Sequence, residues 1–332
     1  DGEGGGGWPP PGLVKYVDGV PVLRTSPERS DVRAFFFYFH HIPKTAGSYF
    51  QNAVEHGRLA RQWKWCRSPS WDQVKGPRAS TAKQARFFDE LLDRVRSSAS
   101  DGQCNVMLYE LDAQREHHTR GMATLRGEGW LPLTFVREPI THVVSMLAHK
   151  SEAYDKQGGL LRRGSYRSPQ DKLYNITCAR EPGYICVNPQ TAHLSERGDP
   201  GHAVEVLGRR MFFFGVTEHF QASLCLLLFQ LGDTYAGPLK KQDCECALQS
   251  GRRPTSMLGR MRNTQGSTFH FSQDDLKHID ALTDDDRRVY AFALHEFHRR
   301  LDVVEREWGM QIRCSARPPP APRPPGKGAG RR

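Results

Sequence analysis

Apolar residues occur along this chain in two patterns, as short continuous runs and as stripes that recur every three or four residues. Continuous runs at 34–39, 105–109, 131–136 and 211–214 predict strands that are buried on both faces. The stripes predict amphipathic helices, because residues spaced in this way share one helix face. Strands that alternate with helices are typical of a parallel sheet covered by helices. We therefore expect an α/β fold, a single domain with a central parallel sheet flanked by helices.

Local signals between these runs predict where helices start and stop. The first helix begins near Ser48, an amphipathic helix covers 87–95, and an apolar helix ends at Leu231 before Gly232. Two later helices begin at capping boxes, in which a hydroxyl and a carboxylate three residues further on bind backbone N–H groups. The two capping pairs are Ser272 with Asp275 and Thr283 with Asp286.

The two ends of the chain differ in composition from the middle. Residues 1–31 are rich in Gly and Pro and predict a stem or disordered segment, 314–332 predict a disordered Pro/Arg-rich tail, and 32–313 form the domain. The net charge of +10 is concentrated in the tail, which leaves a mildly basic domain. A mildly basic domain is compatible with an anionic glycan as a partner and does not predict nucleic-acid binding. The first residue, Asp1, indicates a trimmed product and is compatible with a membrane anchor upstream.

The eight cysteines and one glycosylation sequon, Asn175-Ile-Thr177, favour a secretory lumen. Cys178 and Cys186 flank a loop that contains Pro and Gly, which predicts a disulfide between them. Cys225 lies in an apolar helix and is expected to be a buried free thiol. The cysteines of Cys244-Glu-Cys246 are too close to bridge each other and are expected to pair elsewhere.

A loop of small residues around one lysine joins the first apolar run to the first helix. Pro43 ends the run, and 44–48 read Lys-Thr-Ala-Gly-Ser. A strand, such a loop and a helix start together form a cradle for an anion, because loop N–H groups and the helix dipole favour negative charge there. The usual nucleotide-binding loop has a Gly four residues before Gly-Lys-Ser/Thr, a pattern that is missing here. The alternative is a tight turn with an exposed lysine.

A second candidate anion site follows the third apolar run. Arg137 stands at the end of that run, where a guanidinium could grip a phosphate with two hydrogen bonds. Pro139 suits the first turn of a helix, and Ser145 falls off the buried stripe of that helix and faces the expected cleft. Lys44, Glu110 and Arg137 each follow a predicted strand. We expect the three to converge at the carboxyl edge of the sheet.

Taken together, these segments resemble carbohydrate sulfotransferases, the enzymes that use 3′-phosphoadenosine 5′-phosphosulfate. Pro-Lys-Thr-Ala-Gly-Ser at 43–48 resembles their 5′-phosphosulfate loop, often written Lys-Thr-Gly-Gly-Thr/Ser, with Ala46 in place of a glycine. Arg-Glu-Pro at 137–139, with Ser145 eight residues after the Arg, resembles their 3′-phosphate element. Arg-Asn-Thr at 262–264 resembles their nucleotide-covering loop. The likeness is greatest to the heparan sulfate 6-O- and 2-O-sulfotransferase group.

The resemblance implies a P-loop-like nucleotide-binding sulfotransferase fold that carries sulfuryl transfer from this co-substrate to a hydroxyl of a glycosaminoglycan-like glycan, without a metal. It implies that Lys44 neutralises charge on the leaving phosphate. It also implies a glycoprotein of the Golgi lumen, a type II membrane protein whose anchor is outside this chain, or a secreted protein. The implied cofactor-binding residues are Lys44, Thr45, Ala46, Gly47, Ser48, Tyr49, Arg137, Ser145, Arg262, Asn263 and Thr264.

The general base is expected just after the second strand, where the resembled family has His in the heparan 2-O and 6-O enzymes and Glu in several relatives. Glu110 occupies this place, and partial burial would raise the pKa of its carboxyl towards neutrality. Asp112, His117 and His118 are the other candidates. The alternative for Glu110 is an ion pair with a nearby Arg or Lys.

Two other functions stay open. A P-loop-type small-molecule kinase would need the missing glycine pattern and an acidic residue for Mg²⁺. A non-catalytic polyanion-binding protein could keep the same fold and bind heparin without turning over the donor. The acceptor sugar, its hydroxyl position and the oligomeric state do not follow from the sequence.

Overall fold

The computed structural model covers the whole chain and describes part of it. The described residues are 12–24, 35–55, 63–64, 66, 93, 97, 104–109, 125, 129–146, 187–195, 198–232, 241–246 and 271–314. Outside them lie most of the helix expected at 87–95, the sequon, and the predicted Cys178–Cys186 pair.

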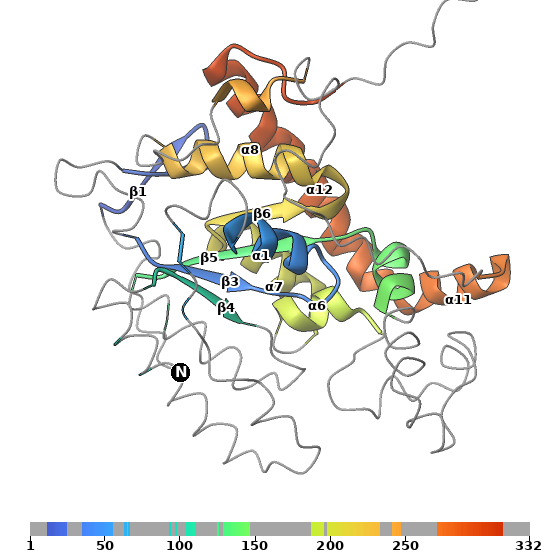
Figure 1. Cartoon of the computed structure of the whole chain (residues 1–332). Helices are drawn as coiled ribbons and strands as arrows, with labels where there is room; N and C mark the ends of the chain where they lie inside the picture. Colours follow the sequence, from blue (N-terminus) through green and yellow to red (C-terminus); the bar gives the residue numbers. More distant parts are fainter. Residues whose placement is uncertain are drawn as a thin grey trace, which may run out of the picture.

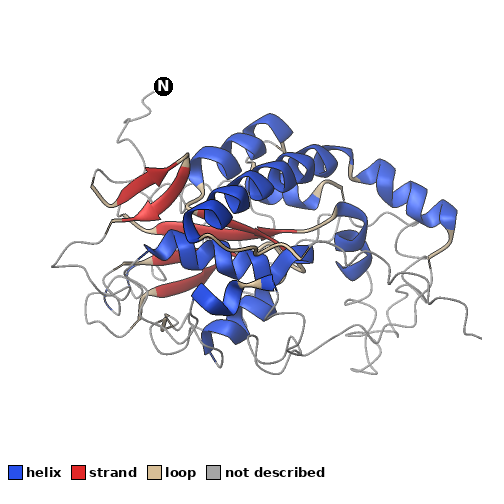
Figure 2. Cartoon of the chain, turned by 90° about the horizontal axis from the view of Figure 1, so that it is seen from above, coloured by secondary structure: helices blue, strands red, loops and turns tan. Residues whose placement is uncertain are grey.

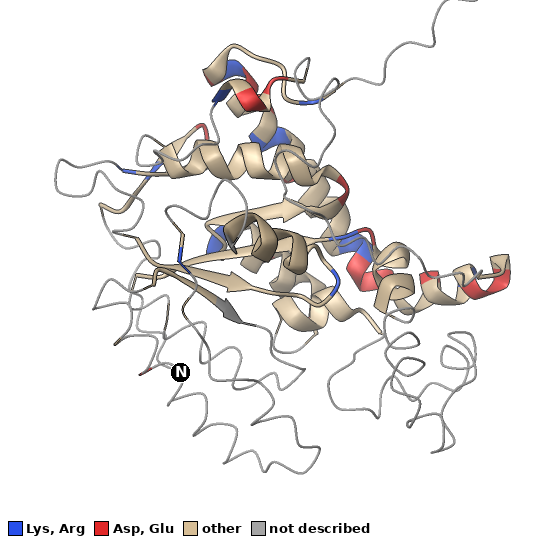
Figure 3. Ribbon diagram, viewed as in Figure 1, with Lys and Arg blue, Asp and Glu red and all other residues tan. Residues whose placement is uncertain are grey.

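Four strands form a parallel sheet in the order β4-β3-β5-β6 (Figure 1). They are β3 (Phe37–His40), β4 (Val106–Tyr109), β5 (Leu131–Val136) and β6 (Phe213–Val216). Every residue of β3, β5 and β6 is buried, and none of the four strands carries a charged side chain (Figure 3). The four continuous apolar runs therefore correspond to strands, and the α/β class with a parallel sheet is confirmed.

Helices lie on both sides of the sheet (Figure 2). They are α1 (Gly47–Glu55), a helical segment at 139–146, α6 (Pro189–Leu194), α7 (Pro200–Glu205), α8 (Phe220–Leu231), α11 (Gln273–Leu282) and α12 (Asp284–Trp308). The starts predicted near Ser48 and at Pro139 and the stop at Gly232 are confirmed within one residue. Gly309 ends α12 in the left-handed region with φ 64°, where glycine avoids the penalty that a Cβ would bring.

An antiparallel hairpin of β1 (Val14–Val17) and β2 (Val20–Leu23) packs against α8. Its turn is tied to α12, because Arg299 donates to the carbonyl oxygen of Asp18 across 2.8 Å and Arg306 pairs with the Asp18 carboxylate. This part of the predicted stem at 1–31 is thus folded onto the domain. The repeated valines of this hairpin favour β-strands, but the Gly- and Pro-rich flanks led to the prediction of a stem or disordered segment.

One predicted capping box is confirmed and the other is wrong. Ser272 and Asp275 bond each other's backbone N–H groups at the start of α11. The Thr283 hydroxyl instead donates to the Ile279 carbonyl oxygen at 3.0 Å and caps nothing in α12. The Asp286 carboxylate is buried and bonds to α6, so it is not available to its own helix.

Three disulfides lie among the described residues: Cys66–Cys104, Cys225–Cys244 and Cys246–Cys314. The free thiol predicted at Cys225 is wrong, because α8 packs against the short 3₁₀ turn Lys241–Cys244 and brings the two sulfurs together. Cys244 and Cys246 do pair elsewhere, as expected. Disulfides persist in oxidising compartments, so the three bridges fit a lumenal or secreted protein.

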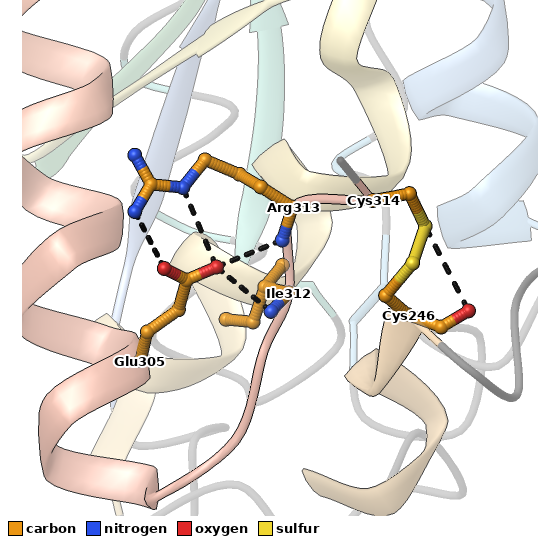
Figure 4. The surroundings of a disulfide bond; sticks show 5 residues. All are labelled: Cys246, Glu305, Ile312, Arg313 and Cys314. Carbon is orange, nitrogen blue, oxygen red and sulfur yellow. Dashed lines mark hydrogen bonds and ion pairs between the residues drawn. A yellow bond between two sulfur atoms is a disulfide. The ribbon is translucent and has the colours of Figure 1, made fainter. Parts of the chain in front are cut away.

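The Cys246–Cys314 bridge closes the end of α12 beside an ionic contact (Figure 4). One carboxylate oxygen of Glu305 accepts hydrogen bonds from the backbone N–H groups of Ile312 and Arg313, both at 2.8 Å. The guanidinium of Arg313 pairs with the same carboxylate. Cys314, which the prediction assigned to the tail, belongs to the folded part. Within the described residues, no helix has the length and apolar character to cross a membrane.

Candidate anion-binding site

The lysine loop connects the end of β3 to the start of α1 and has an unusual backbone. Lys44 and Ala46 both have positive φ values, 66° and 72°. For residues with a Cβ this left-handed conformation costs on the order of 1 kcal/mol or more each, and it persists only where the surroundings enforce it. Left-handed residues that alternate with right-handed ones turn successive N–H groups into a concave, anion-binding surface. The strain therefore points to a ligand site at this loop.

Three consecutive carbonyl oxygens of this segment are bound from inside the protein. The Thr45 hydroxyl donates to Ile42 at 2.7 Å, and the Thr45 N–H donates to the same oxygen at 3.2 Å. His142 Nε2 lies 2.6 Å from the Pro43 oxygen, and Arg137 Nη1 donates to the Lys44 oxygen at 3.0 Å. The negative ends of these peptide groups are thus directed into the protein. The loop then leads into the first turn of α1, whose N–H groups have no partner within the helix.

Gly47 is needed at the start of α1 because of its neighbour rather than its own backbone. A Cβ at this position would lie 1.8 Å from His41 Nε2, far closer than atoms can approach. The His41 ring itself stacks on Phe39, with ring centroids 5.7 Å apart. A small residue at position 47 therefore lets the first turn of α1 close onto the end of β3.

Arg137 leaves the sheet directly after β5 and is partly buried. Burial lowers the pKa of its guanidinium, and the nearby carboxylates of Glu218 and Glu138 offset only part of that shift. An arginine stays charged at neutral pH even when its pKa is lowered. Arg137 is accordingly a fixed cation beside the lysine loop.

Carboxylates arrange the backbone that follows Arg137. Glu138 accepts from the N–H groups of Ile140 and Thr141, at 3.1 and 2.8 Å, and so caps the helical segment at 139–146. The Glu138 N–H donates to Glu218, which also accepts from the Tyr290 hydroxyl at 3.1 Å. These contacts join the ends of β5 and β6 to α12 around the cation.

The described part of the chain brings two of the predicted site residues into direct contact, Lys44 and Arg137. Ala46 and Gly47 are buried in the loop, Ser48 is exposed, and the partly buried Tyr49 ring lies 5.9 Å from that of Phe220. Ser145 is partly exposed on the segment at 139–146. The remaining predicted site residues lie outside the described residues: Glu110, Asp112, His117, His118, Arg262, Asn263 and Thr264.

The sequence did not single out two residues that shape the site, His142 and Gln190. Burial lowers the pKa of His142 to about 3, so its imidazole is neutral and binds the Pro43 carbonyl oxygen as a donor. Its Nδ1 has no hydrogen-bond partner among the described groups. The Gln190 side chain binds the backbone of Arg137. Only the position of His142, five residues after Arg137 on the buried side of a helix, could have indicated its role.

The candidate site combines two cationic residues, a composition that suits an anionic ligand. Lys44 and Arg137 stand at the carboxyl ends of the neighbouring strands β3 and β5, where ligands of parallel sheets bind. Where side chains are described, no group of three or more His, Cys, Asp or Glu residues is arranged to hold a metal ion. Two cations and a helix start can neutralise a ligand that carries more than one negative charge.

Comparison of the whole chain with protein-family models and with curated proteins finds no match.

Proposed function

We propose that this chain is a sulfotransferase that moves a sulfuryl group from 3′-phosphoadenosine 5′-phosphosulfate to a hydroxyl of a glycosaminoglycan-like glycan. One observation carries the proposal: Arg137 Nη1 bonds the Lys44 carbonyl oxygen across 3.0 Å. The contact unites the two segments that resemble the phosphate-binding elements of carbohydrate sulfotransferases. A nucleotide with phosphates on both the 3′ and 5′ positions matches two cations on adjacent strand ends.

In the proposed reaction, the bond between sulfur and the 5′-phosphate oxygen breaks while the acceptor oxygen bonds to sulfur. Lys44 neutralises the charge that develops on the departing phosphate oxygen. The loop N–H groups as far as Tyr49 hold the 5′-phosphate, and Arg137 with Ser145 holds the 3′-phosphate. The acceptor proton passes to a base after β4, for which Glu110 is the first candidate.

The disulfides support the same proposal independently, because they bear on the compartment of the protein. Anionic glycans are modified in compartments where bridges such as Cys66–Cys104 are stable. We assign the protein to the Golgi lumen or to the secreted fraction, and we take its acceptor to be an anionic polysaccharide such as heparan sulfate.

The direct test is incubation of the full chain with radiolabelled sulfate donor and a panel of glycans, followed by disaccharide analysis. We expect transfer to one class of glycan and a loss of about 100-fold or more in Lys44→Ala, since removing a charge-stabilising donor typically has this effect. Lys277→Ala is the matched control, because Lys277 is an exposed cation on α11. Heparin binding without transfer would indicate a non-catalytic polyanion-binding protein, and magnesium-dependent transfer from ATP would indicate a kinase. Either result would overturn the proposal.

A further inference from the structure

We infer that Gln190 is a positioning residue that sets the direction in which Arg137 leaves the sheet, and that α12 holds Gln190 in place through Asp286. The inference deepens the proposed function and rests on it for the identity of the anion. The geometry behind it involves only described residues.

The Gln190 side chain pairs with the backbone that follows β5, beyond the end of the β3–β5 ladder. That ladder ends with His40 paired to Thr134. Past it, on the edge of β5 that faces β3, the Arg137 N–H donates to Gln190 Oε1 at 2.8 Å, and Gln190 Nε2 donates to the Arg137 carbonyl oxygen at 2.7 Å. A carboxamide has one acceptor and one donor on the same planar group, so it pairs with the N–H and C=O of a residue as a neighbouring strand would.

The two hydrogen bonds fix the backbone from which the guanidinium extends. Gln190 is only 1% exposed, so water cannot replace either bond if the amide is lost. With its backbone held, Arg137 places Nη1 on the Lys44 carbonyl oxygen. A substitution at Gln190 should therefore alter the lysine loop, and it should do so through Arg137.

Two helices cap each other and thereby hold Gln190. The carboxylate of Asp286, in the first turn of α12, accepts from the N–H groups of Gln190 and Thr191 at 3.1 and 2.7 Å, and from the Thr191 hydroxyl at 2.8 Å. In return, the Asn188 side chain accepts from the N–H groups of Asp285 and Asp286 at 3.0 and 3.3 Å. Each helix start thus receives its capping group from the other helix.

This reciprocal capping explains why α6 keeps its position although it is only a short helix. A six-residue helix is not stable by itself, and Asn188 makes no side-chain cap to its own helix. The Asp286 carboxylate supplies that cap from α12, which is 25 residues long and packs against α7, α8 and β6. The direction of Arg137 is consequently set by a long helix that is itself packed against several other elements of the domain.

The chain offers a matched control for the loss of a buried amide. Gln230 on α8 is also buried, and its Nε2 donates to the carbonyl oxygens of Pro21 and Phe212 at 3.0 and 2.6 Å. Neither partner belongs to the candidate site. Gln230→Glu and Gln190→Glu both keep the size of the side chain and replace its donor with an acceptor. The two variants therefore separate a general loss of stability from a loss of position at Arg137.

The first experiment measures binding of adenosine 3′,5′-bisphosphate to the full chain by calorimetry. We expect Gln190→Glu to weaken binding about 10- to 100-fold and Gln230→Glu to leave it unchanged within about twofold, while both lower the melting temperature. Thr191→Val, which removes only the hydroxyl bond to Asp286, should weaken binding about threefold and covers the case in which Gln190→Glu fails to fold. Unchanged affinity in the Gln190 and Thr191 variants, or an equal loss in Gln230→Glu, would overturn the inference.

A second measurement does not require a nucleotide. Hydrogen exchange of the ligand-free protein should become faster at 42–48 in Gln190→Glu and not in Gln230→Glu. If wild-type protein does not bind the bisphosphate but this difference is present, the proposed function fails while the positioning role stands. Equal exchange at 42–48 in the two variants would refute the positioning role itself.

Discussion

The guanidinium of Arg137 donates from Nη1 to the carbonyl oxygen of Lys44 across 3.0 Å, although 93 positions separate the two residues in the chain. The contact occupies one nitrogen of the guanidinium, and the proposed function assigns the remaining N–H groups to the phosphate. The same contact also holds the lysine loop in its left-handed conformation at Lys44. The two candidate phosphate sites are thus parts of one structure.

Replacement of Arg137 by lysine should disable the site even though the charge is kept. A lysine ammonium cannot reproduce the planar fork that bonds the Lys44 carbonyl oxygen and a phosphate together. We expect Arg137→Lys to weaken binding of adenosine 3′,5′-bisphosphate about 10- to 100-fold by calorimetry, with Arg209→Lys on the exposed surface as the control. Wild-type affinity in Arg137→Lys would show that charge alone is sufficient.

Addition of one methyl group at Gly47 should displace the loop. Its Cβ would collide with His41 Nε2, so Gly47→Ala is expected to lower bisphosphate affinity about tenfold or more and to lower the melting temperature. The double variant His41→Ala/Gly47→Ala removes the collision and should recover most of the affinity. No recovery in the double variant would mean that position 47 acts through its backbone and not through its contact with His41.

The neutral imidazole of His142 should make the protein sensitive to acid. Burial lowers its pKa to about 3 in the folded protein, from an ordinary value of 6.5. A depressed folded-state pKa contributes stability that is complete above pH 6.5 and is lost as the pH falls towards 3, because only the unfolded chain takes up the proton. Between pH 6.5 and pH 4 this amounts to about 3 kcal/mol.

The variant that tests this is His142→Gln, whose amide can still donate to the Pro43 carbonyl oxygen but does not titrate. Urea unfolding at several pH values should show a smaller loss of stability on acidification in His142→Gln than in wild type. Parallel pH profiles for the two proteins would show that His142 is protonated in the folded state or does not contribute.

The proposed base gives a separate prediction. Glu110→Gln should abolish sulfate transfer and leave bisphosphate binding unchanged, because the amide keeps the shape of the carboxylate but cannot accept the acceptor's proton. Both quantities can be measured on the same preparation. Full activity in Glu110→Gln would remove Glu110 from the mechanism and turn attention to Asp112, His117 and His118.

Loss of the Cys225–Cys244 bridge should destabilise the domain without altering the site. The two cysteines are 19 positions apart, and a loop of that length corresponds to about 2–4 kcal/mol of stability. The double variant Cys225→Ala/Cys244→Ala should unfold at correspondingly lower urea concentration, while bisphosphate affinity stays at the wild-type value. A large drop in affinity would show that α8 is coupled to the lysine loop.

Local sequence patterns predicted what depends on neighbours along the chain. The parallel strands followed from continuous apolar runs, the start of α1 from helical spacing, and the Ser272–Asp275 box from residues three positions apart. The proximity of Lys44 and Arg137 could also be predicted, because residues that follow parallel strands meet at one edge of the sheet.

Features that depend on distant partners did not follow from the sequence. Asp286 has the spacing of a capping residue, but its carboxylate bonds to α6, 95 positions earlier. Cys225 resembles a buried apolar residue in its own helix, and only the turn that ends at Cys244 makes it a disulfide partner. The roles of His142 and Gln190 consist of single contacts to backbone groups far along the chain, which no spacing rule describes.

Three hydrogen bonds that restrain the lysine loop end on main-chain oxygens, those of Ile42, Pro43 and Lys44. Because every residue type carries the same oxygen, these three bonds do not depend on which side chain stands at position 44. Lys44→Ala should therefore keep these three bonds, so that a loss of turnover in this variant is due to the missing ammonium and not to their loss. Such a variant would be suited to trapping the donor and acceptor together for crystallisation.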